Sequence, residues 1–142
     1  IEIGPRDIET RKICVQRRDQ AATEKTFPLK EDFIREAGEM LDEIHQNLLA
    51  RARAFRDANI AACDNLADFD AHWETDNPGW LFTPWAGSAE QEQELSKKHR
   101  ITIRCIPVPG AALPAHLAAT GEAACFLTGT PTTTRVIWGR SY

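Results

Sequence analysis

The sequence contains few cysteines, and their spacing matches no common metal or redox motif. No C-x-x-C pair includes any of Cys14, Cys63, Cys105 and Cys125. Small secreted domains that depend on disulfides are much richer in cysteine than this chain. We therefore predict reduced thiols in a cytoplasmic protein.

Long hydrophobic runs and catalytic signatures are also missing. No apolar run approaches the ~18 residues that would span a membrane, and no signal-peptide pattern opens the sequence, since Arg6, Asp7 and Glu9 interrupt it. The P-loop, G-x-G-x-x-G, H-E-x-x-H and G-x-S-x-G patterns are absent, and the four histidines lie far apart. These absences predict no membrane partner and no self-contained active site.

The chain has no excess of positive charge. Its 142 residues carry 17 Lys and Arg against 21 Asp and Glu, which gives a net charge of −4. Such a protein is not a nucleic-acid polycation, so any RNA contact must come from a local basic patch. The length and the hydrophobic content of 42% fit one average or two small globular domains.

The first part of the chain predicts short strands followed by one long helix. Alternating apolar residues predict strands at 1–3 and 13–16, with a short helix between them that has Pro5 near its first position. An amphipathic helix of roughly seven turns follows, and its apolar positions are Phe33, Ala37, Met40 or Leu41, Ile44, Leu48, Ala52 and Phe55. We expect this helix to pack on a sheet, most simply the one that the preceding strands form.

The composition changes after residue 60, where we place a domain boundary. The elements expected beyond it are a helix that begins at Asn65, a turn at 76–79, a strand at 80–85, a helix at 88–99 opened by a Ser88–Gln91 capping box, a strand at 101–105, a loop at 108–121, and a hairpin of 124–127 with 132–138. The order strand, helix, strand predicts a βαβ unit or a close variant of it.

Several segments together resemble one enzyme family. The segments "IEIGPRDIE" and "KICVQRRD" resemble the end of the anticodon-binding domain of class II aminoacyl-tRNA synthetases. The segments "LARARAFRDANI", "WLFTPWAG", "TIRCIPVP" and the final "WGRSY" resemble the C-terminal extension of prolyl-tRNA synthetases of the archaeal and eukaryotic type. The matches are collinear and cover essentially the whole chain. "RCIP" combined with "GRSY" is the most specific of them.

The resemblance implies a fold and a function. Residues 1–60 would be the C-terminal part of an α/β anticodon-binding domain with a mixed sheet and a long amphipathic helix. Residues 61–142 would be a small α+β domain that closes in a zinc-ribbon-like hairpin. Enzymes of this family activate proline with ATP and Mg²⁺ and esterify tRNA(Pro), and the parent of this chain would be a cytoplasmic homodimer. This portion would lack the catalytic core, contribute to anticodon binding and support the upstream catalytic domain of the same protein.

Two other readings remain open. The chain could be a free-standing RNA-binding module derived from that family, or a protein-interaction domain whose long helix presents a face to a partner. The sequence begins with Ile1 rather than Met and opens on a strand that is cut off at its start. Both features favour a fragment of a longer enzyme.

If the sheet is built as in the family, one group of residues is expected to contact the anticodon loop. RNA affinity depends largely on phosphate contacts, and cations near strand ends and a helix start can supply them. The expected group is Arg6, Asp7, Arg17, Arg18 and Lys25. The competing reading makes Arg6 and Asp7 a local ion pair, and Arg17 and Arg18 a solvated strand end.

A comparison with the zinc site of the family predicts that this chain binds no zinc. Many members bind one structural Zn²⁺ through four cysteines, and the resemblance places these positions at Ala86, Gln91, Cys125 and Thr128. A tetrahedral zinc site needs four donors, and only one cysteine is present. Alanine offers no donor, while Gln and Thr are poor zinc ligands.

The alternative is a metal site built from other residues. It would combine two cysteines with two histidines: Cys105, Cys125, His99 and His116. We favour a metal-free hairpin, in which Cys105 is a buried strand residue and apolar packing supplies the stability. The packing residues are expected to be Trp80, Trp85, Phe126 and Trp138.

The sequence ends on Arg140, Ser141 and Tyr142, which match the ending of the family. In the family the terminal carboxylate is directed toward the catalytic domain. The resemblance therefore implies that the carboxylate of Tyr142 lies near the active site of the parent enzyme. The alternative is a strand that simply stops.

Overall fold

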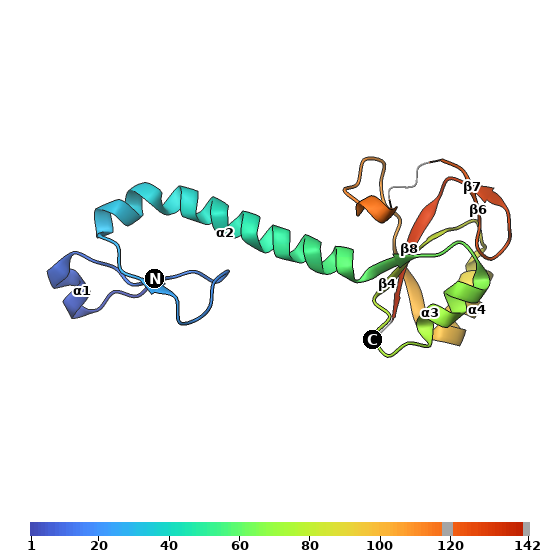
Figure 1. Ribbon diagram of the computed structural model, residues 1–142, viewed down its shortest axis with the longest axis horizontal. Helices are drawn as coiled ribbons and strands as arrows, with labels where there is room; N and C mark the ends of the chain where they lie inside the picture. Colours follow the sequence, from blue (N-terminus) through green and yellow to red (C-terminus); the bar gives the residue numbers. More distant parts are fainter. Residues whose placement is uncertain (118–120, 141–142) are drawn as a thin grey trace. The chain divides into compact units, whose positions relative to one another are not determined.

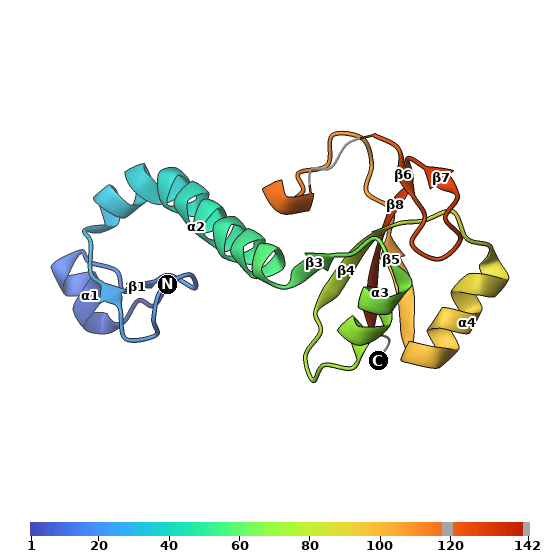
Figure 2. The same ribbon diagram turned by 45° about the vertical axis from the view of Figure 1, so that its right-hand side comes forward.

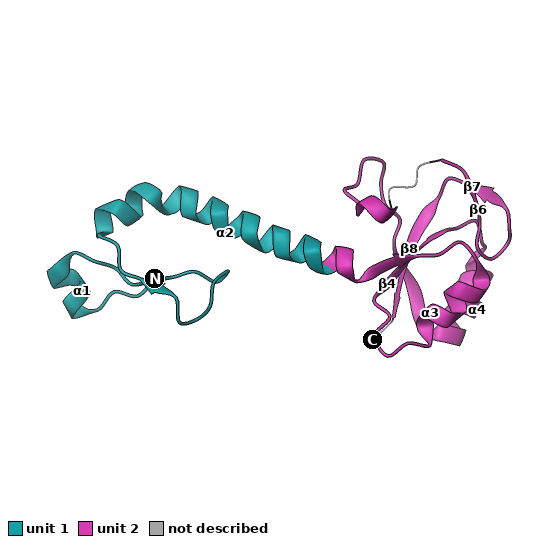
Figure 3. Cartoon of the chain, viewed as in Figure 1, with its two compact units in different colours: residues 1–55 teal, residues 56–142 magenta. Residues whose placement is uncertain are grey.

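The computed structural model describes residues 1–117 and 121–140. The chain forms two compact units, Ile1–Phe55 and Arg56–Tyr142, which are coloured separately in Figure 3. The division falls inside the long helix rather than after residue 60, because Ile60 already pairs with a strand of the second unit. Each unit is described by itself.

Unit 1 contains little regular structure before its long helix. Its elements are α1 (Pro5–Thr10), β1 (Val15–Gln16), β2 (Lys25–Thr26) and the part of α2 (Lys30–Ala58) that precedes Arg56. β1 and β2 form an antiparallel pair, and single bridges join Glu2 to Cys14 and Lys12 to Leu29. The expected strands at 1–3 and 13–16 are thus a bridge and a two-residue strand. Pro5 opens α1, as its fixed φ favours.

The long helix is present, but its expected packing is not. None of the 29 residues of α2 is buried. The expected apolar face is only half-buried at positions such as Ala37 and Ile44, while Ile34, Leu41 and Phe55 are more than half exposed. The prediction that the helix packs on a sheet is therefore wrong for the described chain, since a two-stranded ribbon is too small to cover a helix of this length.

Unit 2 is a mixed sheet with two helices (Figures 1 and 2). Its elements after α2 are β3 (Ile60–Ala62), α3 (Leu66–Trp73), β4 (Trp80–Pro84), α4 (Ala89–His99), β5 (Ile101–Cys105), η1 (Ala115–Leu117), β6 (Ala123–Ala124), β7 (Pro131–Thr132) and β8 (Arg135–Arg140). The four-stranded sheet has the order β3-β4-β8-β5. The predicted α+β architecture with a mixed sheet and a long helix is confirmed.

The sheet topology confirms a close variant of the βαβ unit. β4 and β5, joined by α4, both pair antiparallel with β8, which lies between them. A true parallel neighbour pair is formed by β3 and β4, which α3 connects. β3 is not among the expected elements, because its three residues coincide with the change in composition at which we place a domain boundary.

The closing hairpin is shorter than expected. β6 and β7 form an antiparallel pair, with Ala124 opposite Pro131, so the connection between them is residues 125–130. The strand expected at 132–138 is divided, and β8 leaves the hairpin to become an inner strand of the main sheet. β8, the last described strand, therefore has a partner on each side, β4 and β5.

The two faces of the sheet bury different groups. On the face that α3 and α4 cover, the side chains of alternate β4 residues pack with Trp138, Phe69 and Leu95. Trp138 is fully buried and donates its indole N–H to the Thr83 hydroxyl at 2.9 Å. The opposite face is covered near η1, where Leu117 packs on Ile60 and Phe82.

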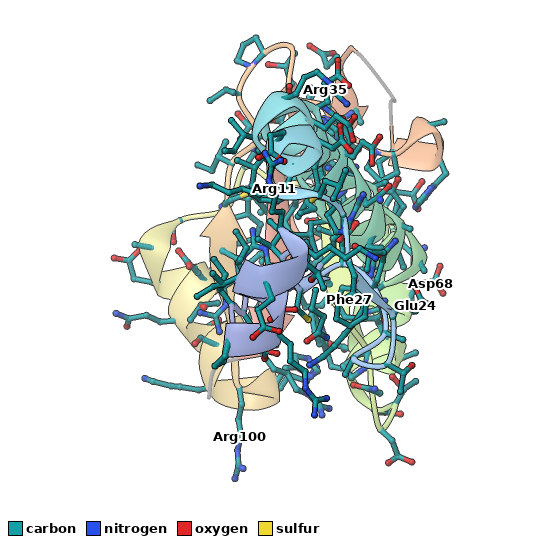
Figure 4. The ribbon with its side chains drawn as sticks, turned by 90° about the vertical axis from the view of Figure 1, so that its left-hand side faces the viewer. Arg11, Glu24, Phe27, Arg35, Asp68 and Arg100 are labelled. Carbon is teal, nitrogen blue, oxygen red and sulfur yellow. The ribbon has the colours of Figure 1, made fainter. Side chains whose placement is uncertain are left out.

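Local sequence signals fix the helix ends of unit 2. The Asn65 side chain accepts a hydrogen bond from Asp68 N at 2.9 Å, and the Ser88–Gln91 capping box is formed in both directions. Both caps were predicted from the sequence. Arg100 ends α4 in the left-handed conformation with φ 58°, and its side chain extends away from the ribbon (Figure 4).

Candidate functional site

Three of the predicted RNA-binding cations lie on the β1–β2 ribbon of unit 1. Gln16 on β1 pairs with Lys25 on β2, so that Arg17 and Arg18 follow directly where β1 ends. Arg6 and Asp7 lie instead on α1, which is joined to the ribbon through the bridge between Glu2 and Cys14. The structure thus brings Arg17, Arg18 and Lys25 to one short ribbon.

Arg17 is bound inside the protein. Its guanidinium contacts both carboxylate oxygens of Asp19, with Nε–Oδ1 at 3.1 Å and Nη2–Oδ2 at 2.8 Å. Its remaining nitrogen, Nη1, donates to Glu43 Oε2 on α2 at 2.7 Å. Only 15% of the Arg17 side chain is exposed. This geometry gives Arg17 an internal role and leaves little of it for a ligand.

Asp19 is the centre of this network. Its side chain has no exposed surface, and it accepts a further hydrogen bond from Asn47 Nδ2 at 2.8 Å. Its backbone carbonyl accepts from Arg51 Nη1 at 3.5 Å. The turn after β1 is therefore attached to α2 by contacts between residues that lie 26 to 32 positions apart.

These contacts shift the pKa values of both Arg17 and Asp19. Hydrogen bonds to Asp19 and Glu43 raise the pKa of the Arg17 guanidinium further above its already high ordinary value. The Arg17 guanidinium, assisted by the Asn47 amide, holds the pKa of the Asp19 carboxyl far below its usual range. Both groups are charged at neutral pH, and their pairing is maintained there.

Arg18 and Lys25 differ in how free they are. Lys25 Nζ lies 3.2 Å from Glu2 Oε2, and this exposed contact raises the pKa of the lysine. Arg18 is exposed and has no side-chain partner among residues 1–117 and 121–140. Arg18 is therefore the member of the ribbon group that is best placed to meet an anion.

Asp7 caps its own helix. Its Oδ2 accepts a hydrogen bond from Gly4 N at 2.7 Å, which satisfies a backbone donor at the start of α1. Arg6 is exposed, and within the described part of the chain it pairs with no carboxylate. The ion pair between Arg6 and Asp7 that we weighed as an alternative is not formed.

Sequence reasoning missed three members of this region: Asp19, Asn47 and Arg51. Asp19 follows two arginines, which gave a signal that it could pair locally. Asn47 and Arg51 continue the face of α2 that begins at Glu43, because residues four apart share a helix face. The contact between this face and the turn joins residues 26 to 32 positions apart, so no local sequence pattern indicates it.

The positions implied for zinc do not fit the metal. Ala86 has no donor atom in its side chain. Gln91 Oε1 accepts from Ser88 N at 2.9 Å as part of the helix cap, and Thr128 Oγ1 donates to Thr130 Oγ1 at 3.0 Å. These side chains serve the local backbone and cannot complete a tetrahedral site with Cys125.

Cys125 is buried in the hairpin. Burial opposes ionisation of its thiol, but hydrogen bonds from the Thr128 hydroxyl and from the backbone N–H groups of Thr128, Ala86 and Leu127 outweigh it. The pKa of the Cys125 thiol is therefore below its ordinary value. The thiol is only 2% exposed, which denies access to reagents in solution.

The replacement metal set is not assembled in the described residues. His99 contacts Asp70 at 2.7 Å and His116 contacts the Ile60 carbonyl at 3.0 Å. Across residues 1–117 and 121–140, no three His, Cys, Asp or Glu side chains are placed to hold a metal ion. The prediction that Cys105 is buried is wrong, because the register shifts between Ile103 and Cys105 and leaves Cys105 exposed.

The hairpin packing was predicted largely correctly. Trp85, Phe126 and Trp138 belong to one buried cluster, in which the Trp85 and Trp138 rings lie 5.2 Å apart, nearly edge to face. Trp80 lies on the other face of the sheet, beside Phe82. Its assignment to the hairpin is therefore wrong, since it alternates with Leu81 across the sheet.

Unit 2 also contains a mixed polar and apolar cleft of about 340 Å³ beside Cys63, Asp64, Asp68 and His116. Burial, followed by the charges of Asp68 and Asp64, raises the pKa of the Cys63 thiol to about 11. The thiol is therefore protonated at neutral pH. A protonated thiol is a poor nucleophile, so Cys63 is not activated for nucleophilic attack in this cleft.

The prediction for the C-terminal carboxylate concerns residues that the structure does not describe. Tyr142, whose carboxylate was expected near an active site, lies outside the described residues, as does Ser141. Among the helices that are described, none is both long enough and apolar enough to cross a membrane.

The chain is similar to prolyl-tRNA synthetases along its whole length. The family model described as "Prolyl-tRNA synthetase, C-terminal" matches residues 66–142. Two relatives named proline–tRNA ligase, from Akkermansia muciniphila and Cytophaga hutchinsonii, are 43% and 32% identical to it over 100% of this chain and 27% of their own length.

A solved structure agrees with these relatives. The crystal structure of prolyl-tRNA synthetase from Cryptosporidium parvum, complexed with L-proline and AMP, aligns with a TM-score of 0.68 and 26% identity. The alignment covers 99% of this chain and 28% of that one. The present chain thus spans little more than a quarter of the proteins it matches. Since the family model covers more than half of its residues, the chain belongs to the prolyl-tRNA synthetase C-terminal family.

Proposed function

We propose that this chain is the C-terminal portion of a proline–tRNA ligase. The observation that carries the proposal is the similarity to proteins of that name over the whole of this chain, at up to 43% identity. The parent enzyme would activate proline with ATP and Mg²⁺ and transfer it to tRNA(Pro). The groups that perform this chemistry would lie in the upstream catalytic domain of the same protein.

Residues 1–60 would serve as the C-terminal part of the anticodon-binding domain. Arg6 and Arg18 are exposed cations that have no carboxylate partner among the described residues, which supports phosphate contacts from both. Lys25 would assist from β2. Arg17 and Asp7 would hold the backbone of the site in place, because Arg17 pairs with Asp19 and Asp7 accepts a hydrogen bond from Gly4 N.

Residues 61–142 would support the catalytic domain. The buried aromatic cluster around Trp138 makes this unit a firm platform, and the carboxylate of Tyr142 would extend from it toward the active site. We assign the chain to the archaeal and eukaryotic type on the segments "RCIP" and "GRSY". The parent would be a cytoplasmic homodimer without zinc in this domain.

The test is aminoacylation by the full-length protein that carries this chain. We expect it to charge tRNA(Pro) with proline in the presence of ATP and Mg²⁺, and to charge tRNA for other amino acids poorly. Removal of residues 56 to 142 from the full-length protein should lower the aminoacylation rate strongly. A full-length protein that binds tRNA(Pro) but charges no tRNA would favour the free-standing RNA-binding module instead.

Two further measurements address the finer parts of the proposal. Metal analysis of the purified protein should find no stoichiometric zinc, and one zinc per chain would contradict us. A short tag added after Tyr142 should lower the aminoacylation rate, because it removes the terminal carboxylate from its place. An unchanged rate would indicate that the strand simply ends there.

A further inference from the structure

The turn after β1 is held in place more firmly than a solvated strand end requires. Arg17 binds both oxygens of Asp19 and one oxygen of Glu43, and Asn47 supplies a second donor to Asp19. We call the turn of residues 17–20 and its contacts on α2 the Asp19 corner. The β1–β2 loop lies beside α2 within unit 1, as both views in Figures 1 and 2 show.

Both carboxylates of the corner are occupied by Arg17. Asp19 has no exposed side-chain surface, so its charge is shielded from anything that approaches from solvent. Two other arginines of the corner have no carboxylate partner among the described residues. Arg18 is exposed at the neighbouring position of the turn, and Arg51 donates only to the neutral Asp19 carbonyl at 3.5 Å. The corner therefore presents unpaired positive charge.

The surrounding helix favours an anion on one side only. Between residues 31 and 43, α2 carries six carboxylates, whereas between residues 44 and 55 it carries none and has two arginines, Arg51 and Arg53. Arg51 thus lies on the half of α2 that carries no carboxylate, whereas Glu43, which contacts Arg17, ends the acidic half. The charge of α2 therefore changes from negative to positive along the helix next to the Asp19 corner.

We propose that Arg18 and Arg51 together bind a phosphodiester of the tRNA, and that Arg17 and Asp19 are positioning residues that hold the turn so that these two arginines reach it. The proposal rests on the proposed function, because it names the contacts that the first unit would make to its RNA. It adds Arg51 to the site and gives an acidic residue a favourable role in RNA binding.

A phosphodiester fits this pair better than a carboxylate does. Two guanidinium groups provide many N–H donors for the two unesterified oxygens of one phosphate. The turn is pinned before the ligand arrives, so that little ordering entropy is lost when it binds. An isolated arginine on a mobile turn would pay that entropy on binding.

Asp19→Asn gives a test by sign. The substitution removes one negative charge near a polyanion, so long-range electrostatics alone predicts tighter binding of tRNA. If Asp19 positions the turn, the variant should instead bind tRNA(Pro) about fivefold to tenfold more weakly. The measurement is a binding titration of the full-length protein with a tRNA(Pro) transcript at several salt concentrations. Tighter binding by the variant would overturn the inference.

Arg18→Gln and Arg51→Gln test the contacts themselves. Each should lower the slope of log affinity against log salt by about 0.7 to 0.9, the value for one lost phosphate contact. Arg53→Gln is the matched control, since Arg53 is an exposed arginine two residues along the same helix. A slope that changes equally for Arg51→Gln and Arg53→Gln would show that only general charge matters.

A double-mutant cycle separates positioning from a loss of stability. Asp19→Asn should have no further effect on tRNA affinity once Arg18 and Arg51 are both replaced by Gln, because Asp19 acts through them. A merely structural role would weaken binding equally in both backgrounds. Arg17→Lys, which keeps the charge but cannot bind both Asp19 oxygens, should behave like Asp19→Asn. Full affinity in Arg17→Lys would count against the positioning role.

The outcome also distinguishes this inference from the proposed function. If Arg6→Gln weakens tRNA binding while every variant of the corner leaves it unchanged, unit 1 binds RNA and the inference is wrong. If tRNA(Pro) is not bound by the full-length protein at all, the proposed function itself fails.

Discussion

The two units of this chain are stabilised by different interactions. Unit 2 buries an aromatic and aliphatic cluster in which Phe69, Trp138 and Val136 have no exposed surface. In the described part of unit 1 only Ile13, Cys14 and Val15 are buried, and long-range ion pairs join the turn to the helix. Apolar burial does not depend on ionisation and is not screened by salt, whereas surface charge pairs are affected by both pH and salt.

This difference suggests a division of labour. A rigid core suits a unit that would support another domain. Unit 1 has few buried residues, so the position of its turn depends on polar contacts such as those from Arg17 and Asn47. The exposed apolar residues of α2, such as Ile34 and Leu41, show that unit 1 covers its apolar groups less completely than unit 2 does.

The largest expected effect is in the core of unit 2. Trp138→Ala removes a fully buried ring that lies 5.5 Å from Phe69 and 5.2 Å from Trp85, and leaves the Thr83 hydroxyl without its donor. We expect the free energy of unfolding of unit 2 to fall by about 3 to 5 kcal/mol. Urea denaturation followed by circular dichroism measures this.

A control for Trp138→Ala is Ile106→Ala, because Ile106 is 62% exposed and should be replaced with little cost. If the two variants unfold at the same urea concentration, the cluster does not hold unit 2 together and the contrast between the units fails.

We expect glycine-to-alanine substitutions in the two units to change stability in opposite directions. Gly79 has φ 68°, and an added Cβ would lie 2.3 Å from the Asn59 carbonyl oxygen, at the point where β3 and β4 begin to pair. We expect Gly79→Ala to destabilise unit 2 by about 2 kcal/mol. Gly38 is an exposed residue within α2, and outside the neighbouring helix backbone no atom of the described residues lies within 4 Å of an added Cβ. Gly38→Ala should stabilise the helix by roughly 0.5 to 1 kcal/mol.

Thermal denaturation of both glycine variants tests this pair. A destabilising Gly38→Ala would mean that the open space around Gly38 is filled in solution. A neutral Gly79→Ala would mean that the start of β4 relaxes without cost.

Sequence patterns predicted the features of unit 2 that depend on neighbouring residues. The caps at Asn65 and Ser88 were correct because each is made within four residues. The alternation in β4 and β5 gave the strands. It failed at Cys105, where a bulge against β8 changes the face of the residue, and no local signal reports a bulge that is made with a strand thirty residues later.

Unit 1 was predicted less well for the same physical reason. The long helix was evident from its periodicity, yet what it packs on depends on chain segments far away. The Asp19 corner was missed, although Arg17 and Arg18 were singled out, because its partners Glu43, Asn47 and Arg51 are known only once α2 is placed beside the turn. Sequence reasoning treated Arg17 as a ligand-binding residue, whereas the structure shows it paired internally.

Acid should affect the Asp19 corner in a specific pH range. The folded-state pKa of Asp19 is depressed, so its contribution to stability is complete above the unfolded value of about 3.9 and is lost as the pH falls through the lower folded value. A carboxyl-carbon NMR titration should show Asp19 still ionised at pH 3.5, when a glutamate with the ordinary pKa of about 4.3 is largely protonated.

The same titration has a clear negative outcome. If Asp19 titrates at the ordinary aspartate pKa of about 3.9, the pairing with Arg17 does not persist in solution. Asp70 is a useful comparison in unit 2. Although burial opposes its ionisation, contacts with Lys98 and His99 lower its pKa, and it should also titrate below the exposed carboxyls.

The smallest effect is expected where a charge pair is fully at the surface. Arg35 contacts Asp32 at 2.6 Å and Glu36 at 2.9 Å, but 66% of its side chain is exposed. Water and salt screen such a pair, and holding it costs side-chain entropy. Arg35→Gln should therefore leave the urea midpoint unchanged, whereas Arg17→Gln should lower it, because Arg17 is mostly enclosed and holds the turn to α2. Equal midpoints for the two variants would show that burial does not rank the ion pairs of unit 1, and the stabilising role of the corner would have to be abandoned.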